Sequence, residues 1–509
     1  MTNPTVLFRS LLVYGLCLPL ALFLGYVLAN PLDFFTFIVV GAVFMLLMTP
    51  LFLKYYHVWL MATWNMSVVV FMLPGNPQLW MAMTAIGLMI TVLQYILSRE
   101  HRLISVPSLT WPLLAMAAVV LLTAKLTGGI GLRSFGSNVY GGKRYFLMLL
   151  AILGYFVLVS RRIPFKKANL YVALFFLGSG TMAIGSTAGL LPASFNWLYV
   201  VFPVENLGYL SNITQSLMTR SWGLALLSLG VFCAMLTKYG AKGILDLHRP
   251  HRLILFLGFI FIGLLGGFRS VMIIYIMTFG ILLYLEGMLR TRLLPAILLT
   301  IILSGALLTA FATSLPLSVQ RSLAFLPIRI DPIAKLDAQA SSEWRIRMWK
   351  NVLPEIPQNL FIGKGYLFSS TDDWMLQFKI GEEGARGSEL VGDYHNGPLS
   401  VILPFGLPGV FAFIWLLYAG TKALYRNYKY SIPEYKLINT FLFAYFLARV
   451  VFFAAVFGSL YSDLALFTGL LGVSVSLNGG VAQPEAEPQP QFVLGERVAP
   501  AQAEPQPVT

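Results

Sequence analysis

One of the five histidines in the chain is placed where an imidazole could act as a base. His57, His101, His248 and His251 lie in or beside basic segments, whereas His395 follows a long polar segment and directly precedes an apolar run. An imidazole that is neutral near pH 7 can accept a proton from an attacking hydroxyl group. His395 is therefore a candidate general base. The alternative is a histidine that caps a helix start or bonds a loop carbonyl.

A candidate anion-binding arginine lies in Ser-Ser-Glu-Trp-Arg-Ile-Arg-Met-Trp-Lys, residues 341–350. The serines followed by Glu343 predict a helix start. At about 100° per residue, Arg345 and Arg347 lie on opposite helix faces. Arg345 shares its face with three apolar residues: Met348, Trp349 and Val352. A guanidinium directed at an apolar surface needs a counter-charge, such as a bound phosphate. The alternatives are an internal partner such as Asp393, or a side chain that extends toward water.

Further cations occur at the ends of apolar runs. Arg269 lies in Gly-Gly-Phe-Arg-Ser between two such runs, and Arg220 begins another. Lys143 and Arg144 begin a third run. A charge within a membrane segment is usually functional, although a side chain near the interface can also extend into water. Several cations on one membrane face favour an anionic lipid headgroup as the ligand.

Two charges near the carboxyl end predict an ion pair. Arg449 and Asp463 each lie seven residues from a turn near Val456, so an antiparallel helical hairpin places them at similar depth. Opposite charges inside a membrane commonly pair, and we expect a structural role for this pair. No spacing of histidines, cysteines or carboxylates predicts a metal site, and no phosphate-binding loop is present.

The composition indicates a polytopic integral membrane protein. Of the 509 residues, 58% are hydrophobic and 11% are charged, against about 25% charged residues in soluble domains. The net charge of +14 arises in short segments between apolar runs, which does not favour nucleic-acid binding. Apolar runs of about 20 residues match the thickness of a bilayer. They predict an all-α fold of about fourteen transmembrane helices, near residues 10–29, 32–53, 57–73, 78–97, 109–125, 143–160, 168–190, 219–237, 253–268, 270–287, 293–313, 397–418, 437–456 and 461–478.

The basic residues also predict the orientation. They collect in alternate loops, which places both termini in the cytoplasm by the positive-inside rule. Residues 1–313 then hold eleven spans, residues 397–478 hold three, and residues 314–396 form one large outer loop with short helices. That loop contains ten of the 21 acidic residues. The segment 479–509 is rich in Pro, Ala, Glu and Gln, which predicts a disordered cytoplasmic tail.

These motifs resemble those of the bacterial O-antigen ligase superfamily, which includes O-antigen polymerases and protein O-oligosaccharyltransferases. The family signature His-[Asn/Ser/Gln]-x9-Gly-x-x-[Gly/Thr/Tyr] is matched from His395 to Gly409. An Arg-x-x-x-Trp helix is matched by Arg345 to Trp349, and a Gly-x-Gly turn by Gly363 to Gly365. Arg269 resembles an arginine that members carry in a Ser/Gly-rich helix start. The matches span about residues 265–410.

The resemblance implies a glycosyltransferase in the bacterial inner membrane with a periplasmic active site. Its donor would be a glycan on undecaprenyl diphosphate, its acceptor a lipid, a glycan or a protein hydroxyl, and no cofactor would be needed. His395 would activate the acceptor, and Arg345, Arg269 and Arg220 would hold the diphosphate. A flippase or exporter of lipid-linked glycans is the alternative. Such transporters usually have two related halves and charges along a midplane cavity, and neither pattern is present in this sequence.

Overall fold

The computed structural model describes the chain in eight stretches, and it is helical throughout apart from one short ribbon. The described residues are 14–15, 17–26, 34–97, 104–131, 139–203, 220–291, 294–369 and 391–484. The ribbon consists of β1 (Val139–Tyr140) and β2 (Phe368–Ser369), which pair antiparallel. An all-helical membrane architecture is thus confirmed.

The helices of the described residues are of two kinds, α-helices and 3-10 helices. The α-helices are α2 (Phe34–Thr63), α3 (Leu79–Leu97), α4 (Pro107–Thr127), α5 (Gly142–Leu158), α6 (Ala168–Leu177), α7 (Thr181–Ala188), α8 (Leu198–Val201), α10 (Trp222–Ile244), α11 (Pro250–Leu265), α12 (Arg269–Leu285), α13 (Leu294–Phe311), α14 (Leu317–Ser322), α15 (Pro332–Val352), α18 (Gly397–Tyr430), α19 (Pro433–Ala455) and α20 (Leu460–Asn478). The 3-10 helices are η2 (Phe165–Lys167), η3 (Gly178–Gly180), η4 (Ala193–Phe195), η5 (Met288–Arg290), η6 (Ala312–Ser314), η7 (Leu353–Glu355) and η8 (Pro357–Asn359).

Within the described residues, seven helical segments are long and apolar enough to cross a membrane. They are α3, α4, the segment Phe165–Ala188, α10, α18, α19 and α20. A bent pair, Val39–Leu51 with Lys54–Thr63, makes an eighth span if its two parts are counted together. Four shorter apolar helices accompany them: Cys17–Tyr26, Pro250–Leu265, Arg269–Leu285 and Ile302–Ser314. The chain is an integral membrane protein, and the count of about fourteen spans stays a prediction.

The span expected over residues 57–73 is wrong. The helix α2 ends at Thr63, and the chain continues as turns and extended backbone to α3. Tyr55 has non-helical backbone angles, and the direction of the helix changes by 112° between the two arms of the bent pair. Beyond Thr63, Gly75 and Asn76 both adopt positive φ, which ends any helical continuation. The apolar residues of this stretch line a turn instead of a separate span.

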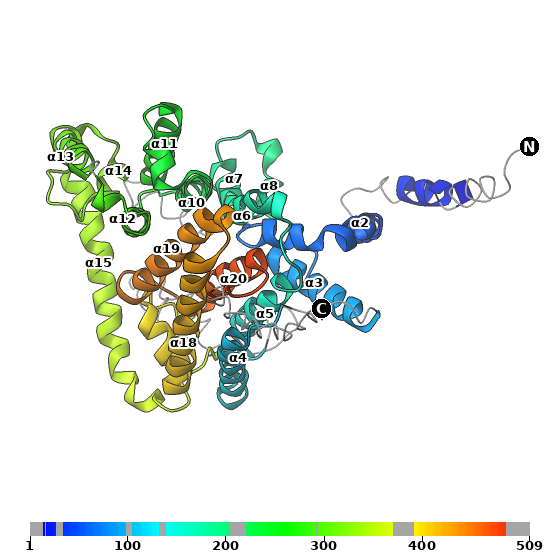
Figure 1. Cartoon of the computed structure of the whole chain (residues 1–509). Helices are drawn as coiled ribbons and strands as arrows, with labels where there is room; N and C mark the ends of the chain where they lie inside the picture. Colours follow the sequence, from blue (N-terminus) through cyan, green and yellow to red (C-terminus); the bar gives the residue numbers. More distant parts are fainter. Residues whose placement is uncertain are drawn as a thin grey trace, which may run out of the picture.

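The carboxyl-terminal helices form the centre of the bundle. In α20, 78% of the apolar window is buried, the largest share among the seven spans. It packs against α5, α18 and α19, while α18 also packs against α4, and α19 against α12 (Figure 1). This arrangement explains the placement of polar groups in α20, because a helix enclosed by other helices can pair its charges away from lipid.

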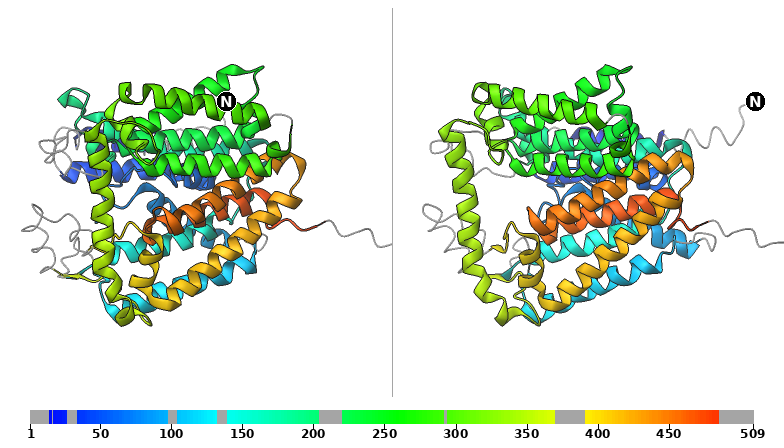
Figure 2. Two further views of the ribbon diagram at one scale, coloured as in Figure 1. Left: turned by 90° about the vertical axis from the view of Figure 1, so that its left-hand side faces the viewer. Right: turned by 60° about the vertical axis from the view of Figure 1, so that its left-hand side comes forward.

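The described stretch of residues 314–369 crosses one end of this bundle. Its longest element, α15, runs across the ends of the spanning helices from α14 to the beginning of α18, as both views of Figure 2 show. Asp331 caps α15 through a hydrogen bond from the Ile333 amide to its carboxylate. The helix therefore begins at Pro332, not at Ser341 as the sequence predicted, because an acidic cap followed by proline is itself a strong start.

The connection after α15 joins α18 through main-chain hydrogen bonds. The amides of Lys364 and Gly365 donate to carbonyls at positions 403 and 404, and the Leu407 amide donates to the Leu360 carbonyl (2.7 Å). The two carbonyls and the Leu407 amide belong to α18. They are available for these bonds because the helix is broken at Gly406, which has φ +61°. A Cβ at Gly406 would lie 2.6 Å from the Leu360 carbonyl oxygen, so only glycine fits.

Candidate active site

His395 lies two residues before the start of α18 at Gly397. Its backbone adopts φ +49°, and the next residue, Asn396, caps α18 by accepting the Leu399 amide hydrogen bond (3.1 Å). The left-handed conformation costs a non-glycine residue of order 1–3 kcal/mol. The cap and the strained backbone together turn the imidazole out of the helix and toward α15. The helix cap belongs to Asn396 and not to His395, which weakens one alternative reading of the histidine.

Two aromatic rings enclose the imidazole. Phe457 stacks on it with ring centroids 5.2 Å apart and an interplanar angle of 26°. Trp344 of α15 lies on another side at 5.3 Å. The indole of Trp349 donates to the Tyr394 carbonyl (2.8 Å), which ties α15 to the backbone beside His395. Neither Phe457 nor Trp344 was among the residues predicted to form the site. Phe457 lies 62 residues after His395 (457 − 395), beyond the reach of any helical spacing.

Burial and charge decide the protonation of His395. Burial lowers its pKa below the ordinary 6.5, Arg345 lowers it further, and Asp393 opposes both by raising it. The Nδ1 atom lies 3.6 Å from the Asp393 carboxylate. Of the two ring nitrogens, Nδ1 is the one that faces this carboxylate, so Nε2 is the candidate proton acceptor. The imidazole is therefore neutral at neutral pH, the form that a general base requires.

Arg345 occupies the face of α15 that meets the bundle. Met348 and Val352 on the same face are buried, whereas Arg347 is exposed, in agreement with the predicted helical faces. The guanidinium lies over the Phe457 ring at 5.6 Å. Its Nε is buried and has no hydrogen-bond partner within the described residues. A buried donor without a partner is costly, which favours a ligand that supplies an acceptor.

The pKa of Arg345 shows how positive its surroundings are. Burial, followed by the charges of Arg269, Arg321 and Arg220, lowers this pKa to about 10, and Asp393 opposes the shift by raising it. The guanidinium still carries its charge at neutral pH, because a pKa near 10 lies well above 7. Four arginines thus affect one another across the junction of α12, α14 and α15. A polyanion bound between them would relieve this mutual repulsion.

Arg269 is held at the start of α12. Its guanidinium donates to the Ser342 hydroxyl (3.0 Å), one turn of helix before Arg345. The contact joins α12 to α15 on the side of Arg345. No carboxylate is needed for this contact, so the charge of Arg269 adds to the positive field of the site.

Arg220 has a carboxylate partner in the structure. Its guanidinium donates to Asp337 of α15 at 2.5 Å. Arg321 of α14, which the sequence analysis did not single out, also pairs with Asp337 and donates to the Gly267 carbonyl. Burial would raise the pKa of Asp337, but hydrogen bonds and charges from the two arginines lower it. The assignment of Arg220 to the donor diphosphate stays a prediction. A bound diphosphate would have to compete with Asp337 for the Arg220 guanidinium.

The expected pair in the final hairpin is present. Arg449 donates to Asp463 at 2.6 Å, and the other carboxylate oxygen accepts the Ser459 amide at 2.8 Å. Both side chains are largely buried. The carboxylate thereby also caps the first turn of α20. In the described part of the chain, no group of three or more His, Cys, Asp or Glu side chains is close enough to hold a metal ion.

The comparison with protein families agrees with the position of this site. Residues 253–414 match the family model described as O-Antigen ligase. The resemblance to the O-antigen ligase superfamily is confirmed for this segment, which contains Arg269, Arg345 and His395. Arg220 and the pair Arg449–Asp463 lie outside it. No curated protein matches the chain.

Proposed function

We propose, with the O-antigen ligase match over residues 253–414 as premise, that the chain is a membrane glycosyltransferase of the ligase or polymerase type. The donor is a glycan on undecaprenyl diphosphate, and the acceptor is a hydroxyl of a lipid, a glycan or a protein. One observation carries the proposal. A base held neutral by burial, His395, shares a site with Arg345, a partly buried cation whose buried Nε has no partner within the described residues.

The chemistry follows from these two groups. Nε2 of His395 takes the proton of the acceptor hydroxyl, and the acceptor oxygen attacks the anomeric carbon of the donor sugar. The bond from that carbon to the diphosphate oxygen breaks, and undecaprenyl diphosphate leaves with the bonding electrons. Arg345 and Arg269 stabilise the negative charge that develops on this leaving group. Nucleotide and metal are not needed, because the diphosphate is already an activated leaving group.

The site is proposed to face the periplasm, with both termini in the cytoplasm. The described residues 314–369 lie across the end of the bundle where α18 begins, and the basic loop residues such as Lys166 belong to the other end of the predicted topology. Single cysteines replace Ser369 and Lys166 to test this. We expect an impermeant thiol reagent to label Ser369→Cys in cells with a permeabilised outer barrier, and to leave Lys166→Cys unlabelled. The reverse labelling would invert the orientation.

The central test is transfer by the purified protein. It is incubated with an undecaprenyl-diphosphate-linked glycan and candidate acceptors, without nucleotide or added metal. We expect a new glycosidic bond and free undecaprenyl diphosphate in equal amounts. Vesicles containing the protein provide the contrast: translocation of the intact lipid-linked glycan without any new bond would identify an exporter and overturn the proposal.

A further inference from the structure

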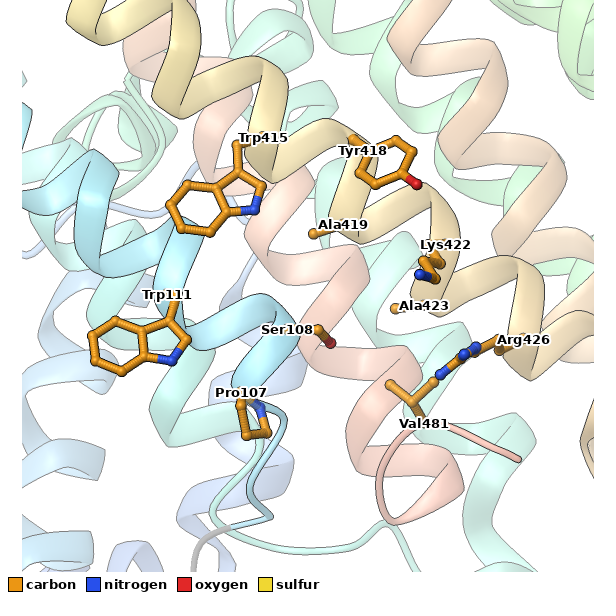
Figure 3. Close-up of a pocket in the computed structure, with 10 residues that line it drawn as sticks. All are labelled: Pro107, Ser108, Trp111, Trp415, Tyr418, Ala419, Lys422, Ala423, Arg426 and Val481. Atoms are coloured by element: carbon orange, nitrogen blue, oxygen red, sulfur yellow. The ribbon is translucent and has the colours of Figure 1, made fainter. Parts of the chain in front are cut away.

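A cavity of about 310 Å³ opens between the beginning of α4 and the second half of α18. Trp111 and Trp415 lie at one end of it, and Lys422 and Arg426 at the other (Figure 3). Lys422 and Arg426 are one helical turn apart on α18, so both ammonium and guanidinium groups point to the same side. None of these residues takes part in the site around His395.

Hydrogen bonds fix the segment after α20 against α18 at one side of the cavity. The Ala482 amide donates to Asn427 (2.8 Å), and Asn427 donates to Ser474 of α20 (2.9 Å). Asn427 is 1% exposed. These bonds hold Val481 against Arg426 at the cationic end of the cavity. The cavity is therefore defined by three separate elements and not by a gap between two mobile side chains.

The charge of the cavity favours a phosphate. Lys422 and Arg426 are both exposed, and α4 begins at Pro107 with no side-chain cap, so its positive end faces the same region. Ser108 adds a hydroxyl donor. Among the described residues, no acidic side chain lines the cavity. A cation pair with a helix start and a hydroxyl provides donors on several sides of one anionic group.

The other end of the cavity favours a hydrocarbon chain. Trp111 is 62% exposed and Trp415 is 48% exposed, although both belong to spanning helices. Trp415 lies eleven residues before Arg426 on α18 (426 − 415), which is about 16 Å deeper along the helix. An apolar indole surface at this depth lies in the hydrocarbon region and contacts acyl chains. The ligand is thus anionic at one end and apolar at the other.

The cavity lies at the membrane face opposite His395. Lys422 lies 16 residues beyond the break of α18 at Gly406 (422 − 406), which corresponds to about 24 Å of unbroken helix, and the arm from Gly397 to the break precedes it at the α15 end of the bundle (Figure 2). The hydrocarbon core of a bilayer is about 30 Å thick, so the cation pair lies at the other interface. The predicted orientation makes this the cytoplasmic face, where anionic lipids attract basic residues.

We propose that this cavity binds an anionic glycerophospholipid of the surrounding bilayer. The lipid phosphate lies between Lys422, Arg426 and Ser108, and an acyl chain extends along the two tryptophans. This inference does not depend on the glycan-transfer proposal. Loss of lipid binding would leave the His395 chemistry untouched, and loss of glycan transfer would leave the lipid site untouched.

The test uses the full-length protein in phosphatidylcholine nanodiscs that contain a photoactivatable phosphatidylglycerol. We expect adducts on the peptides that carry Trp111 or Trp415, and roughly 30-fold weaker binding in the double variant Lys422→Gln/Arg426→Gln, since each cation adds about fivefold. The matched control Lys166→Gln/Lys167→Gln removes two exposed charges from the same predicted membrane face but outside the cavity. It should bind like the unmodified protein.

Several outcomes would overturn the lipid assignment. Equal labelling in both double variants would exclude selection by the cation pair, and equal labelling by photoactivatable phosphatidylcholine would exclude selection by charge. Displacement of the adduct by millimolar inorganic phosphate would indicate a site for a free anion. A carbodiimide cross-link from Lys422 to the glutamates of residues 485–509, with no lipid adduct, would show that the chain's own terminal segment occupies the cavity.

Discussion

The Nδ1 atom of His395 lies 3.6 Å from an oxygen of Asp393, and neither atom has a hydrogen-bond partner within the described residues. The separation is too long for a hydrogen bond, which requires about 3.2 Å or less. The two groups are nevertheless near enough to attract each other once the imidazole is protonated. Asp393 therefore acts on the charged form of His395, which arises only after a proton has been accepted.

Replacing the imidazole should abolish transfer and leave the fold intact. We expect His395→Ala to reduce glycan transfer by about a hundred- to ten-thousand-fold, because a positioned general base contributes that much to a rate. Donor binding should persist, because the diphosphate contacts belong to other residues. Transfer and donor binding by the purified variant are the measurements. Near-normal transfer would remove the proposed base.

A lysine cannot replace the arginine of the α15 face. Arg345→Lys keeps the charge but loses the planar fork that suits a diphosphate, so donor binding and transfer should both fall severely. Arg347→Lys, on the exposed face of the same helix, should be nearly silent. Binding of the lipid-linked donor to both variants is measured beside transfer. Equal losses in the two variants would indicate general damage to α15.

The pH dependence should respond in opposite directions to two neighbouring charges. His395 works when neutral, so transfer falls as the pH drops through its pKa, which lies below 6.5. Arg345 lowers this pKa, and Arg345→Gln should move the acidic inflection of kcat/KM to higher pH. Asp393 raises it, and Asp393→Asn should move the inflection to lower pH. Arg345→Lys keeps the charge and serves as the control. Shifts in one direction for both neutral variants would contradict the assignment.

The pair in the final hairpin should support folding and not catalysis. Neutralising Arg449 or Asp463 alone leaves the partner buried without a counter-charge, a loss on the order of 3 kcal/mol. We expect a lower folded yield from each single variant, measured by size-exclusion chromatography in detergent. The exchanged variant Arg449→Asp/Asp463→Arg should recover part of it. Normal yield with lost transfer in both single variants would move the pair into the active site.

The candidate site was predictable where residue type and local spacing were sufficient. His395 stood out because it precedes an apolar run after a polar segment, and helical periodicity separated the faces of Arg345 and Arg347. The hairpin pair followed from equal distances to one turn. These inferences use only neighbours along the chain, and the structure agrees with the positions they imply.

Contacts between distant segments were not predictable. Arg321 and Asp337 are 16 residues apart on different helices, and no periodicity connects them. Phe457 reaches His395 only because α18, α19 and α20 pack together. The span expected over residues 57–73 failed because hydropathy does not register the bend at Tyr55 or the turn at Gly75. Hydropathy indicates whether a segment lies in lipid or in water, but it does not indicate where a helix bends or ends.

The break of α18 at Gly406 affects which substitutions the connection between α15 and α18 can accept. Because the Leu360 carbonyl and the amides of residues 364, 365 and 407 make the junction, its geometry is independent of most side chains nearby. Substitutions along the surface of the segment can therefore reshape what it recognises without moving Arg345 relative to His395. A change of Gly406 to any larger residue would meet the Leu360 carbonyl and displace both at once. Recognition and catalysis are in this way separately mutable within one continuous stretch of chain.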